Sequence, residues 1–308
     1  MSLRIVFMGT PDFAVPTLDV LIQNGYNVVG VITSTDKMGG RGGKKLIQSA
    51  VKKYAVEKGL KVLQPPKFKN PEFLAELRSL KADLQIVVAF RMLPEVVWNM
   101  PTIGTINLHG SLLPAYRGAA PIHWAVINGA SKTGVTSFFL KHEIDTGDIL
   151  LAETMQIGPD ENTGEVHDKM MLLGAETILM SVQLIESQKY TLKPQDASKV
   201  SKAPKLFKEN CKIDFNKPAN YIHNFIRGLN PYPLAWTTMD GQEVKILKAK
   251  INYDIHSHEP GSIHTDYKHF FRFAIDAGYI DVLKLKPAGK RAMDVKDFLN
   301  GYKEGFQK

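Results

Sequence analysis

Strands and helices alternate through the first part of this chain, and this alternation restricts its fold more than any other feature. It begins with the strand-like run RIVFMG at 4–9 and the helical segment that follows it as far as Asn24-Gly25. The same pattern predicts further strands and helices, at 28–33, 70–81, 82–90, 104–110, 123–130, 133–140 and 163–188. Such alternation implies parallel pairing through right-handed crossovers. We therefore predict an α/β fold with a Rossmann-like, open and mostly parallel sheet.

The last third of the chain has a different pattern. A polar, lysine-rich stretch with two prolines follows the long helix and is typical of a linker. Beyond it, short strand-like segments alternate with turn residues, at 235–240, 243–253, 261–266, 271–278 and 279–289. This spacing predicts a smaller C-terminal β-barrel domain of the OB-like type. We therefore predict a Rossmann-like domain at 1–188, a linker at 189–206 and an OB-like domain at 207–308.

Length and cysteine content agree with an ordinary globular protein of two domains. The chain has 308 residues, and its single cysteine, Cys211, excludes an internal disulfide framework. No uninterrupted apolar run approaches the roughly 20 residues of a membrane-spanning helix. The first residues, MSLRIVFMGT, lead straight into a predicted strand and leave no room for a signal peptide. We expect a cytoplasmic protein that does not enter a membrane, and a monomer.

The net charge of +8 is unevenly distributed along the chain. Residues 1–188 carry 18 Lys and Arg against 18 Asp and Glu, whereas residues 189–308 carry 21 against 13. Such asymmetry indicates either a surface for a polyanionic partner or a basic face kept for solubility. Charge alone leaves both interpretations open.

Two common kinds of site are not supported by the sequence. The first strand ends in MGTPDF rather than in a Gly-x-Gly-x-x-Gly turn, so a nicotinamide dinucleotide has no phosphate cradle there. Four histidines lie close together at 256, 258, 264 and 269. Their spacing matches no zinc pattern, so we expect an exposed loop and predict no metal site.

Three polar residues at strand ends are the candidates for catalysis. Asn107 and His109 end the predicted strand 104–110, and Asp145 lies in the loop after the strand 133–140. In an open α/β sheet, ligands bind beyond the carboxyl ends of the strands. An amide there can donate to an oxyanion, an imidazole can move a proton, and a carboxylate can orient the imidazole, which suits acyl or formyl transfer. The alternative is that these residues only close and cap turns.

A family resemblance adds to this interpretation. The stretch NLHGSLLPAYRGAAP at 107–121, with DTGD at 145–148, resembles the formyltetrahydrofolate-dependent formyltransferases. Within that superfamily the chain is similar, essentially from end to end, to the methionyl-tRNA formyltransferases. Further matching segments lie at 4–14, 40–45, 51–55, 230–233 and 286–293. One departure is Phe215, where the family more often has Trp; it concerns the packing between the domains and not the chemistry.

The resemblance assigns roles to single residues. It implies a catalytic triad of Asn107, His109 and Asp145. It implies a tetrahydrofolate-binding run of Ser111, Leu112, Leu113 and Pro114. The segment Ala89–Leu93 corresponds, more weakly, to a wall for the pterin ring. Arg117 and the turn 118–121 either shape the mouth of the sheet, where the triad and the folate-binding run meet, or serve the structure alone.

The resemblance also offers an explanation for the basic residues. Ten Lys and Arg lie between Asp36 and Lys69, against only two acidic residues, and basic groups suit phosphates. The family pattern places Arg41, Lys44 and Lys45 in a loop that enters the acceptor end of a tRNA. It also makes the C-terminal domain, 207–308, a tRNA-binding domain.

The function implied by the resemblance is formyl transfer in translation initiation. The formyl group would move from 10-formyltetrahydrofolate, a co-substrate, to the amino group of initiator methionyl-tRNA, without a metal. A formyltransferase for a nucleotide-linked amino sugar is the alternative; it would share the triad but has no use for the basic loop. An inactive tRNA-binding module is a second alternative, and the intact Asn–His–Asp set argues against it.

Overall fold

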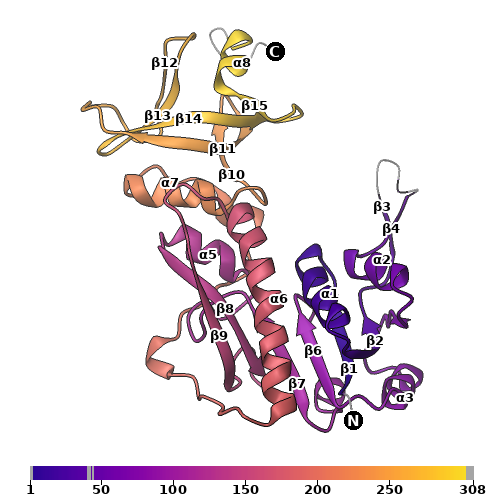
Figure 1. The fold of residues 1–308 in the computed structure, drawn as a ribbon. Helices are drawn as coiled ribbons and strands as arrows, with labels where there is room; N and C mark the ends of the chain where they lie inside the picture. The colour runs from indigo at the N-terminus through magenta and orange to yellow at the C-terminus, as the bar shows by residue number, and fades with distance from the viewer. Residues whose placement is uncertain (1–2, 40–42, 44, 303–308) are drawn as a thin grey trace. The chain divides into compact units, whose positions relative to one another are not determined.

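The computed structural model describes residues 3–39, 43 and 45–302 (Figure 1). The chain divides into two compact units. The first comprises Met1–Gly118, Gly134–Met155 and His167–Lys202, and the second comprises Ala119–Thr133, Gln156–Val166 and Ala203–Lys308. The first unit thus includes much of the segment expected to be a linker. The predicted domain boundaries at 188 and 206 stay a prediction.

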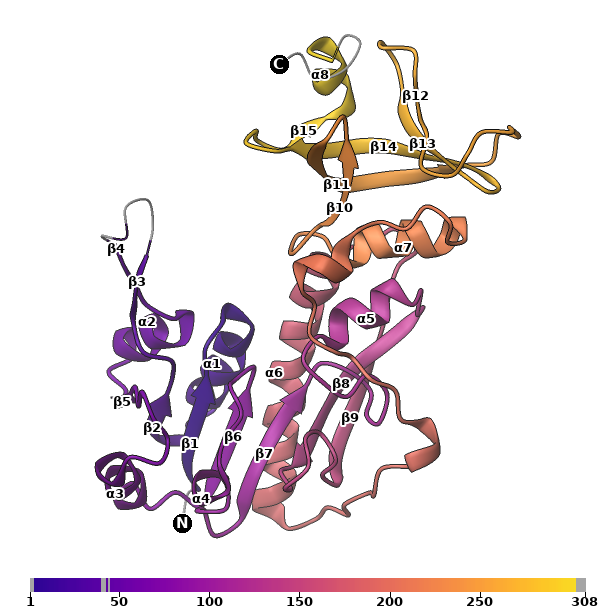
Figure 2. The same cartoon turned by 180° about the vertical axis from the view of Figure 1, so that it is seen from behind.

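Seven strands form one open sheet in the order β5-β2-β1-β6-β7-β8-β9 (Figure 2). The strands are β1 (Arg4–Gly9), β2 (Asn27–Ile32), β5 (Val62–Leu63), β6 (Leu84–Val88), β7 (Gly104–His109), β8 (Lys132–Phe139) and β9 (Ile149–Gln156). The strands from β5 to β7 pair in parallel, and β8 runs antiparallel to β7. The predicted open, mostly parallel sheet is therefore confirmed. Its centre is apolar, because Ile5, Val6, Phe7 and Met8 of β1 are all fully buried.

Helices alternate with these strands, and α1, α3, α5 and α6 match the predicted helices, whereas α2 and α4 were not predicted. They are α1 (Val15–Gln23), α2 (Ala50–Glu57), α3 (Pro71–Ser79), α4 (Glu95–Trp98), α5 (Pro121–Ile127) and α6 (Thr163–Ser187). Local sequence explains where α3 begins, since the Asn70 side chain accepts a hydrogen bond from the Glu72 amide and Pro71 occupies the first helical position. Among the described residues, short 3-10 helices lie at Asp12–Ala14, Ala197–Lys199 and Lys208–Cys211.

Helix α6 is long and apolar enough to cross a membrane, judged by length and composition alone. Its apolar side is nevertheless used inside the first unit. Gly174 lies so close to β7 that an added Cβ would be 2.6 Å from Leu108, and the Ser181 hydroxyl lies 2.7 Å from that of Ser137 in β8. Ile178 and Val182 are fully buried. These contacts account for the composition of α6 as a core helix of a folded unit.

The C-terminal part is built on a second, antiparallel sheet in the order β10-β11-β14-β13-β12, with β15 also paired to β14. Its strands are β10 (Ala235–Met239), β11 (Gln242–Asn252), β12 (Ile263–Thr265), β13 (Phe271–Ile275), β14 (Gly278–Pro287) and β15 (Met293–Asp294). The sheet forms a half-barrel, which confirms the expected small β domain.

Two helices accompany this sheet, α7 (Ala219–Gly228) and α8 (Val295–Asn300). Helix α7 was not predicted, although Ile222, Phe225 and Ile226 stand at helical spacing and are buried. Phe215, the departure from the family pattern, is also buried and stacks on Phe273 with ring centroids 4.7 Å apart. A phenylalanine therefore packs at this position within the second unit.

Candidate active site

The end of strand β7 carries two of the three predicted catalytic residues. Asn107 and His109 stand two residues apart in a strand, so their side chains leave β7 on the same face. His109 is only 7% exposed, and Asn107 is half-buried. Within the part of the chain that the structure describes, the Asn107 carboxamide makes no hydrogen bond. It is therefore available to a bound molecule.

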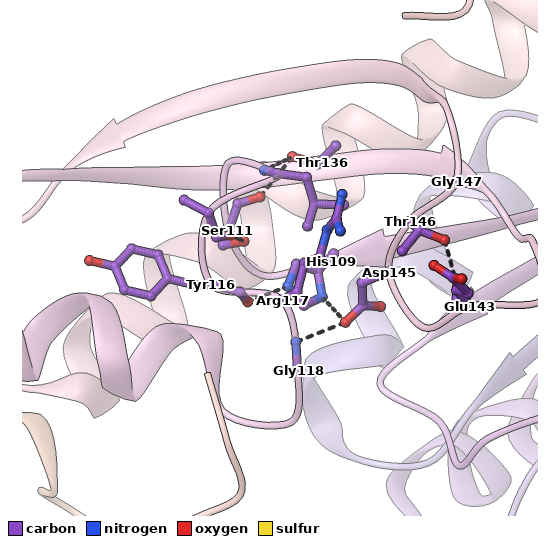
Figure 3. Close-up of polar contacts among 12 residues, drawn as sticks. His109, Ser111, Tyr116, Arg117, Gly118, Thr136, Glu143, Asp145, Thr146 and Gly147 are labelled. Atoms are coloured by element: carbon purple, nitrogen blue, oxygen red, sulfur yellow. Dashed lines mark hydrogen bonds and ion pairs between the residues drawn. The ribbon is translucent and has the colours of Figure 1, made fainter. Parts of the chain in front are cut away.

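The imidazole of His109 lies between two acceptors (Figure 3). Its Nε2 is 2.9 Å from the Tyr116 carbonyl oxygen, and its Nδ1 is 3.8 Å from Oδ2 of Asp145. A carbonyl can only accept, so the proton of a neutral ring lies on Nε2 and is donated to Tyr116. The separation at Nδ1 is too long for a direct hydrogen bond. Nδ1 is therefore the nitrogen that remains open to a substrate or a water molecule.

Asp145 faces His109 from the loop between β8 and β9. Its Oδ2 also accepts a hydrogen bond of 2.9 Å from the Gly118 amide, which points the carboxylate toward the imidazole. The backbone of Asp145 has φ +56°, a left-handed conformation that aspartate tolerates better than most residues. At Gly147 there is no room for a side chain, since an added Cβ would collide with the Phe139 carbonyl oxygen. The DTGD motif thus sets a tight loop that presents Asp145.

The structure thus brings the predicted triad to one edge of the first sheet. Asn107 and His109 share a strand face, and Asp145 meets His109 from the next loop. The sequence missed the two backbone groups that complete the arrangement, the Tyr116 carbonyl and the Gly118 amide. Gly118 belongs to the turn 118–121, which was expected either to shape the mouth or to serve the structure alone, and Tyr116 lies just before Arg117. Backbone groups carry no signal of their own in a sequence, so only the structure could find them.

The run expected to bind folate is a compact loop. The Thr136 hydroxyl of β8 donates to the Ser111 carbonyl at 2.7 Å and accepts from the Leu113 amide at 3.0 Å. The Ser111 hydroxyl donates to the Ala115 carbonyl at 2.6 Å. Ser111 and Leu113 are consequently buried, whereas Leu112 and Pro114 are half-buried. Only the latter two offer much apolar surface to a ligand.

The segment Ala89–Leu93, expected as a weaker match to a pterin wall, follows β6 directly. The Arg91 guanidinium lies 3.9 Å from the centre of the Phe68 ring and donates to the carbonyl oxygens of Pro65 and Pro66. Burial lowers the pKa of Arg91. Phe90 packs edge-on against the same Phe68 ring. This segment is therefore held from one side by an aromatic and cationic cluster.

One of the basic residues expected to enter the tRNA, Lys45, lies in a small antiparallel hairpin of β3 (Lys37–Gly39) and β4 (Lys45–Ile47). Lys45 is exposed in β4, while Arg41 and Lys44 lie outside the described residues. The hairpin also exposes large apolar side chains, namely Met38 (63%), Leu46 (53%) and Ile47 (51%).

The root of this hairpin is held by a polar cluster. The Lys52 ammonium lies 2.5 Å from one oxygen of Asp36, and the Gln64 amide donates to the other at 2.8 Å and to the Ser34 carbonyl at 2.6 Å. The hydrogen bond from Gln64 and that from Lys52 lower the pKa of Asp36. The hairpin is therefore anchored at its base.

The histidine-rich stretch at 256–269 includes strand β12. Within the described residues, no group of three or more His, Cys, Asp or Glu could hold a metal ion. His264 lies in β12, half-buried rather than in an exposed loop, and its ring centre is 3.9 Å from that of His258. Burial, followed by the neighbouring positive charges, lowers the pKa of His264.

Comparison with known proteins gives matches along nearly the whole chain. Residues 3–182 match the formyl transferase family, and residues 205–303 match the formyl transferase C-terminal domain. A methionyl-tRNA formyltransferase of Parabacteroides distasonis is 54% identical over 98% of this chain and 97% of that protein. One from Bacteroides fragilis is 52% identical over 98% of this chain and 95% of that protein.

Solved structures with much lower identity share the fold. An N-formyltransferase from Helicobacter canadensis, in complex with folinic acid and dTDP-3-aminofucose, superposes with a TM-score of 0.70 at 20% identity, covering 91% of this chain and 98% of that one. HypX from Aquifex aeolicus, in complex with tetrahydrofolic acid, superposes with a TM-score of 0.63 at 17% identity. This match covers 97% of this chain and 47% of that one. At these identities the likeness supports the fold alone.

Proposed function

The chain belongs to the methionyl-tRNA formyltransferases, and on that premise we propose that Asn107, His109 and Asp145 carry its reaction. The enzyme transfers a formyl group from 10-formyltetrahydrofolate to the α-amino group of methionyl-tRNA. The observation that carries the assignment is the His109–Asp145 pair, 3.8 Å apart, with Asn107 on the same face of β7 as His109. The identity of more than 50% to methionyl-tRNA formyltransferases removes the amino-sugar alternative.

The reaction forms and breaks one bond each at the formyl carbon. The neutral amine of methionyl-tRNA attacks that carbon and creates a tetrahedral oxyanion. The bond to N10 of the folate then breaks, and the proton lost by the amine ends on N10. The Asn107 amide donates to the oxyanion, because it is half-buried and has no partner among the described residues. Loss of one such donor typically costs about 10²–10³ in rate.

His109 and Asp145 move the proton in this proposal. Because Nε2 of His109 donates to the Tyr116 carbonyl, Nδ1 is the nitrogen that takes up and releases the proton. The carboxylate of Asp145, 3.8 Å away, stabilises the imidazolium that forms. The Gly118 amide keeps that carboxylate in place while the charge appears.

The remaining assignments concern binding. We propose that the folate lies against the loop 111–114, on the half-buried surfaces of Leu112 and Pro114. We propose that Arg41, Lys44 and Lys45 approach the acceptor end of an initiator tRNA. The C-terminal domain, 207–308, would hold the tRNA body through its excess of basic residues, joined to a catalytic domain at 1–188 by the linker 189–206. We also propose that the enzyme acts in the cytoplasm as a monomer.

The catalytic assignment can be tested with three substitutions and one matched control. His109→Ala, Asn107→Ala and Asp145→Ala are each mixed with labelled formyl donor and methionyl-tRNA, and the label on the tRNA is followed. Each rate should fall by at least about 10². His142→Ala is the control, because the His142 side chain is 74% exposed and makes one exposed ion pair with Glu95. Rates near wild type in two of the three variants would refute the assignment.

A further inference from the structure

The segment 193–202 was expected to be part of a linker, yet the first unit binds it on two sides. At one end, Lys193 and Ile149 exchange two backbone hydrogen bonds of 2.8 and 2.9 Å. Ile149 begins β9, directly after the loop that presents Asp145. The segment 193–202 is therefore paired with the strand residue that directly follows the Asp145 loop.

At its other end the segment holds the loop that follows the folate run. The Ser201 carbonyl accepts from the Arg117 amide at 2.9 Å, and the Ser201 hydroxyl accepts from the Tyr116 amide at 2.8 Å. Tyr116 is the residue whose carbonyl accepts the hydrogen bond from Nε2 of His109. The segment 193–202 thus touches both loops on which the orientation of His109 depends.

Gln195 lies within this segment and uses its whole side-chain amide. Its Nε2 donates to the carbonyl oxygens of Asp145 at 2.9 Å and Gly147 at 2.8 Å. Its Oε1 accepts from Nε of Arg117 at 2.9 Å and from Nη2 at 2.6 Å. A guanidinium only donates and a carbonyl only accepts, so one orientation of the amide fits. All four hydrogen-bonding positions of Gln195 are filled.

One of these four bonds acts directly on Asp145, the residue that faces His109. The carbonyl of Asp145 is held by Gln195, and its carboxylate is held by the Gly118 amide. Hydrogen bonds to both the backbone and the side chain of Asp145 fix the direction of its carboxylate. The Asp145 backbone is held in a left-handed conformation with φ +56°. Without the Gln195 amide, two carbonyls lose their donor and the loop can relax toward ordinary backbone angles.

We propose that Gln195 is a positioning residue for catalysis, which ties the Asp145 loop to Arg117 so that Asp145 faces His109. The proposal rests on the proposed roles of Asp145 and His109. The enzyme with a mispositioned Asp145 should still bind both substrates but turn over slowly, because errors of about 1 Å cost up to about 100-fold in rate.

Two substitutions separate the two halves of the amide. Gln195→Met removes all four hydrogen bonds, whereas Gln195→Glu keeps an acceptor for Arg117 and replaces the donor by an oxygen that faces two carbonyls. Both should lower kcat by about 10- to 100-fold and leave both KM values within about threefold. Gln183→Met, at an exposed position of α6, is the matched control and should retain wild-type kcat. Near-wild-type turnover of Gln195→Glu would overturn the proposal, since Gln195 would then act only through Arg117.

A double-mutant cycle tests whether Gln195 acts through Asp145, measured as single-turnover rates with enzyme in excess. In the Asp145→Ala background, Gln195→Met should cost less than about threefold, because the carboxylate to be positioned is gone. An equal loss in both backgrounds would overturn the positioning role and leave the catalytic assignment intact. A wild-type rate for Asp145→Ala alone would instead refute that assignment. Melting temperatures of all variants, compared with wild type, show whether any loss of rate reflects unfolding.

Discussion

The site at the end of β7, called the mouth here, and the β3–β4 hairpin differ in how far their side chains are buried and fixed by the protein. At the mouth, both nitrogens of His109 face groups of the protein itself, and the ring is almost completely buried. On the hairpin, Met38, Leu46 and Ile47 are more than half exposed, and Lys45 is exposed as well. The hairpin is held by side-chain bonds at its root, through Asp36.

This difference matches the two proposed roles, chemistry at the mouth and tRNA recognition at the hairpin. A proton-transfer site needs its geometry before the substrate arrives, because reorganisation during the reaction raises the barrier. A segment that binds a nucleic acid can become ordered when the partner binds, provided that it is anchored where it joins the domain. We therefore expect changes at the mouth to act on kcat and changes at the hairpin to act on the use of methionyl-tRNA.

The largest effect should come from removing the imidazole at the mouth. His109→Ala deletes the group proposed to take up the proton, and we expect kcat to fall by about 10³ or more, as for other general acid–base and oxyanion groups. Affinity for the formyl donor, measured by calorimetry, should change little. A variant that loses folate affinity but keeps kcat would place His109 in binding, and the contrast between the two regions would fail.

An intermediate effect should come from the root of the hairpin. Lys52→Met leaves Asp36 without its ammonium partner and loosens the base on which the hairpin stands. We expect kcat/KM for methionyl-tRNA to fall by about tenfold, with folate affinity unchanged, because a misplaced acceptor end costs orientation.

The matched control for that variant is Lys53→Met. It removes the same charge from the neighbouring, exposed position of α2. If the two variants lose the same kcat/KM, the effect is one of overall charge, and anchoring at Asp36 has no part in it.

A smaller effect should come from the basic residues of the hairpin region. Replacing Arg41, Lys44 and Lys45 together by Ser should weaken tRNA binding and flatten its salt dependence. The slope of log K against log salt should fall by about 0.7–0.9 for each phosphate that these side chains neutralise. Folate affinity should stay the same. An unchanged salt slope would show that these residues do not bind phosphates.

Much of the fold could be predicted because burial leaves periodic signals. The strand RIVFMG is confirmed as β1 and the helix from Thr163 as α6, since apolar runs and helical spacing report directly on a core. The sequence did not predict that β8 runs antiparallel to β7, because alternation orders elements but does not orient every strand. Helix α7 was missed because short strand-like segments dominate the region around it.

The candidate site shows the same division. Asn107, His109 and Asp145 could be proposed because polar side chains at strand ends are conspicuous among apolar neighbours. The segment 193–202 could not, since backbone hydrogen bonds and one glutamine amide hold it to the site. A polar, proline-containing sequence has the same pattern whether it is a free linker or a segment hydrogen-bonded to a domain.

The smallest effect concerns acid stability at the hairpin root. Hydrogen bonds from Gln64 and Lys52 lower the pKa of Asp36 below its ordinary value of 3.8. The unfolded chain therefore binds this proton more readily than the folded chain does, so the cluster stabilises the fold fully above that value. This contribution is lost as pH falls below it, through the folded-state pKa.

In Asp36→Asn the bond to Gln64 can persist but the titration is gone. The free energy of unfolding, measured in urea between pH 6 and pH 3, should therefore fall less steeply with acid in Asp36→Asn than in wild type. If the two curves stay parallel, the charge of Asp36 does not hold the hairpin.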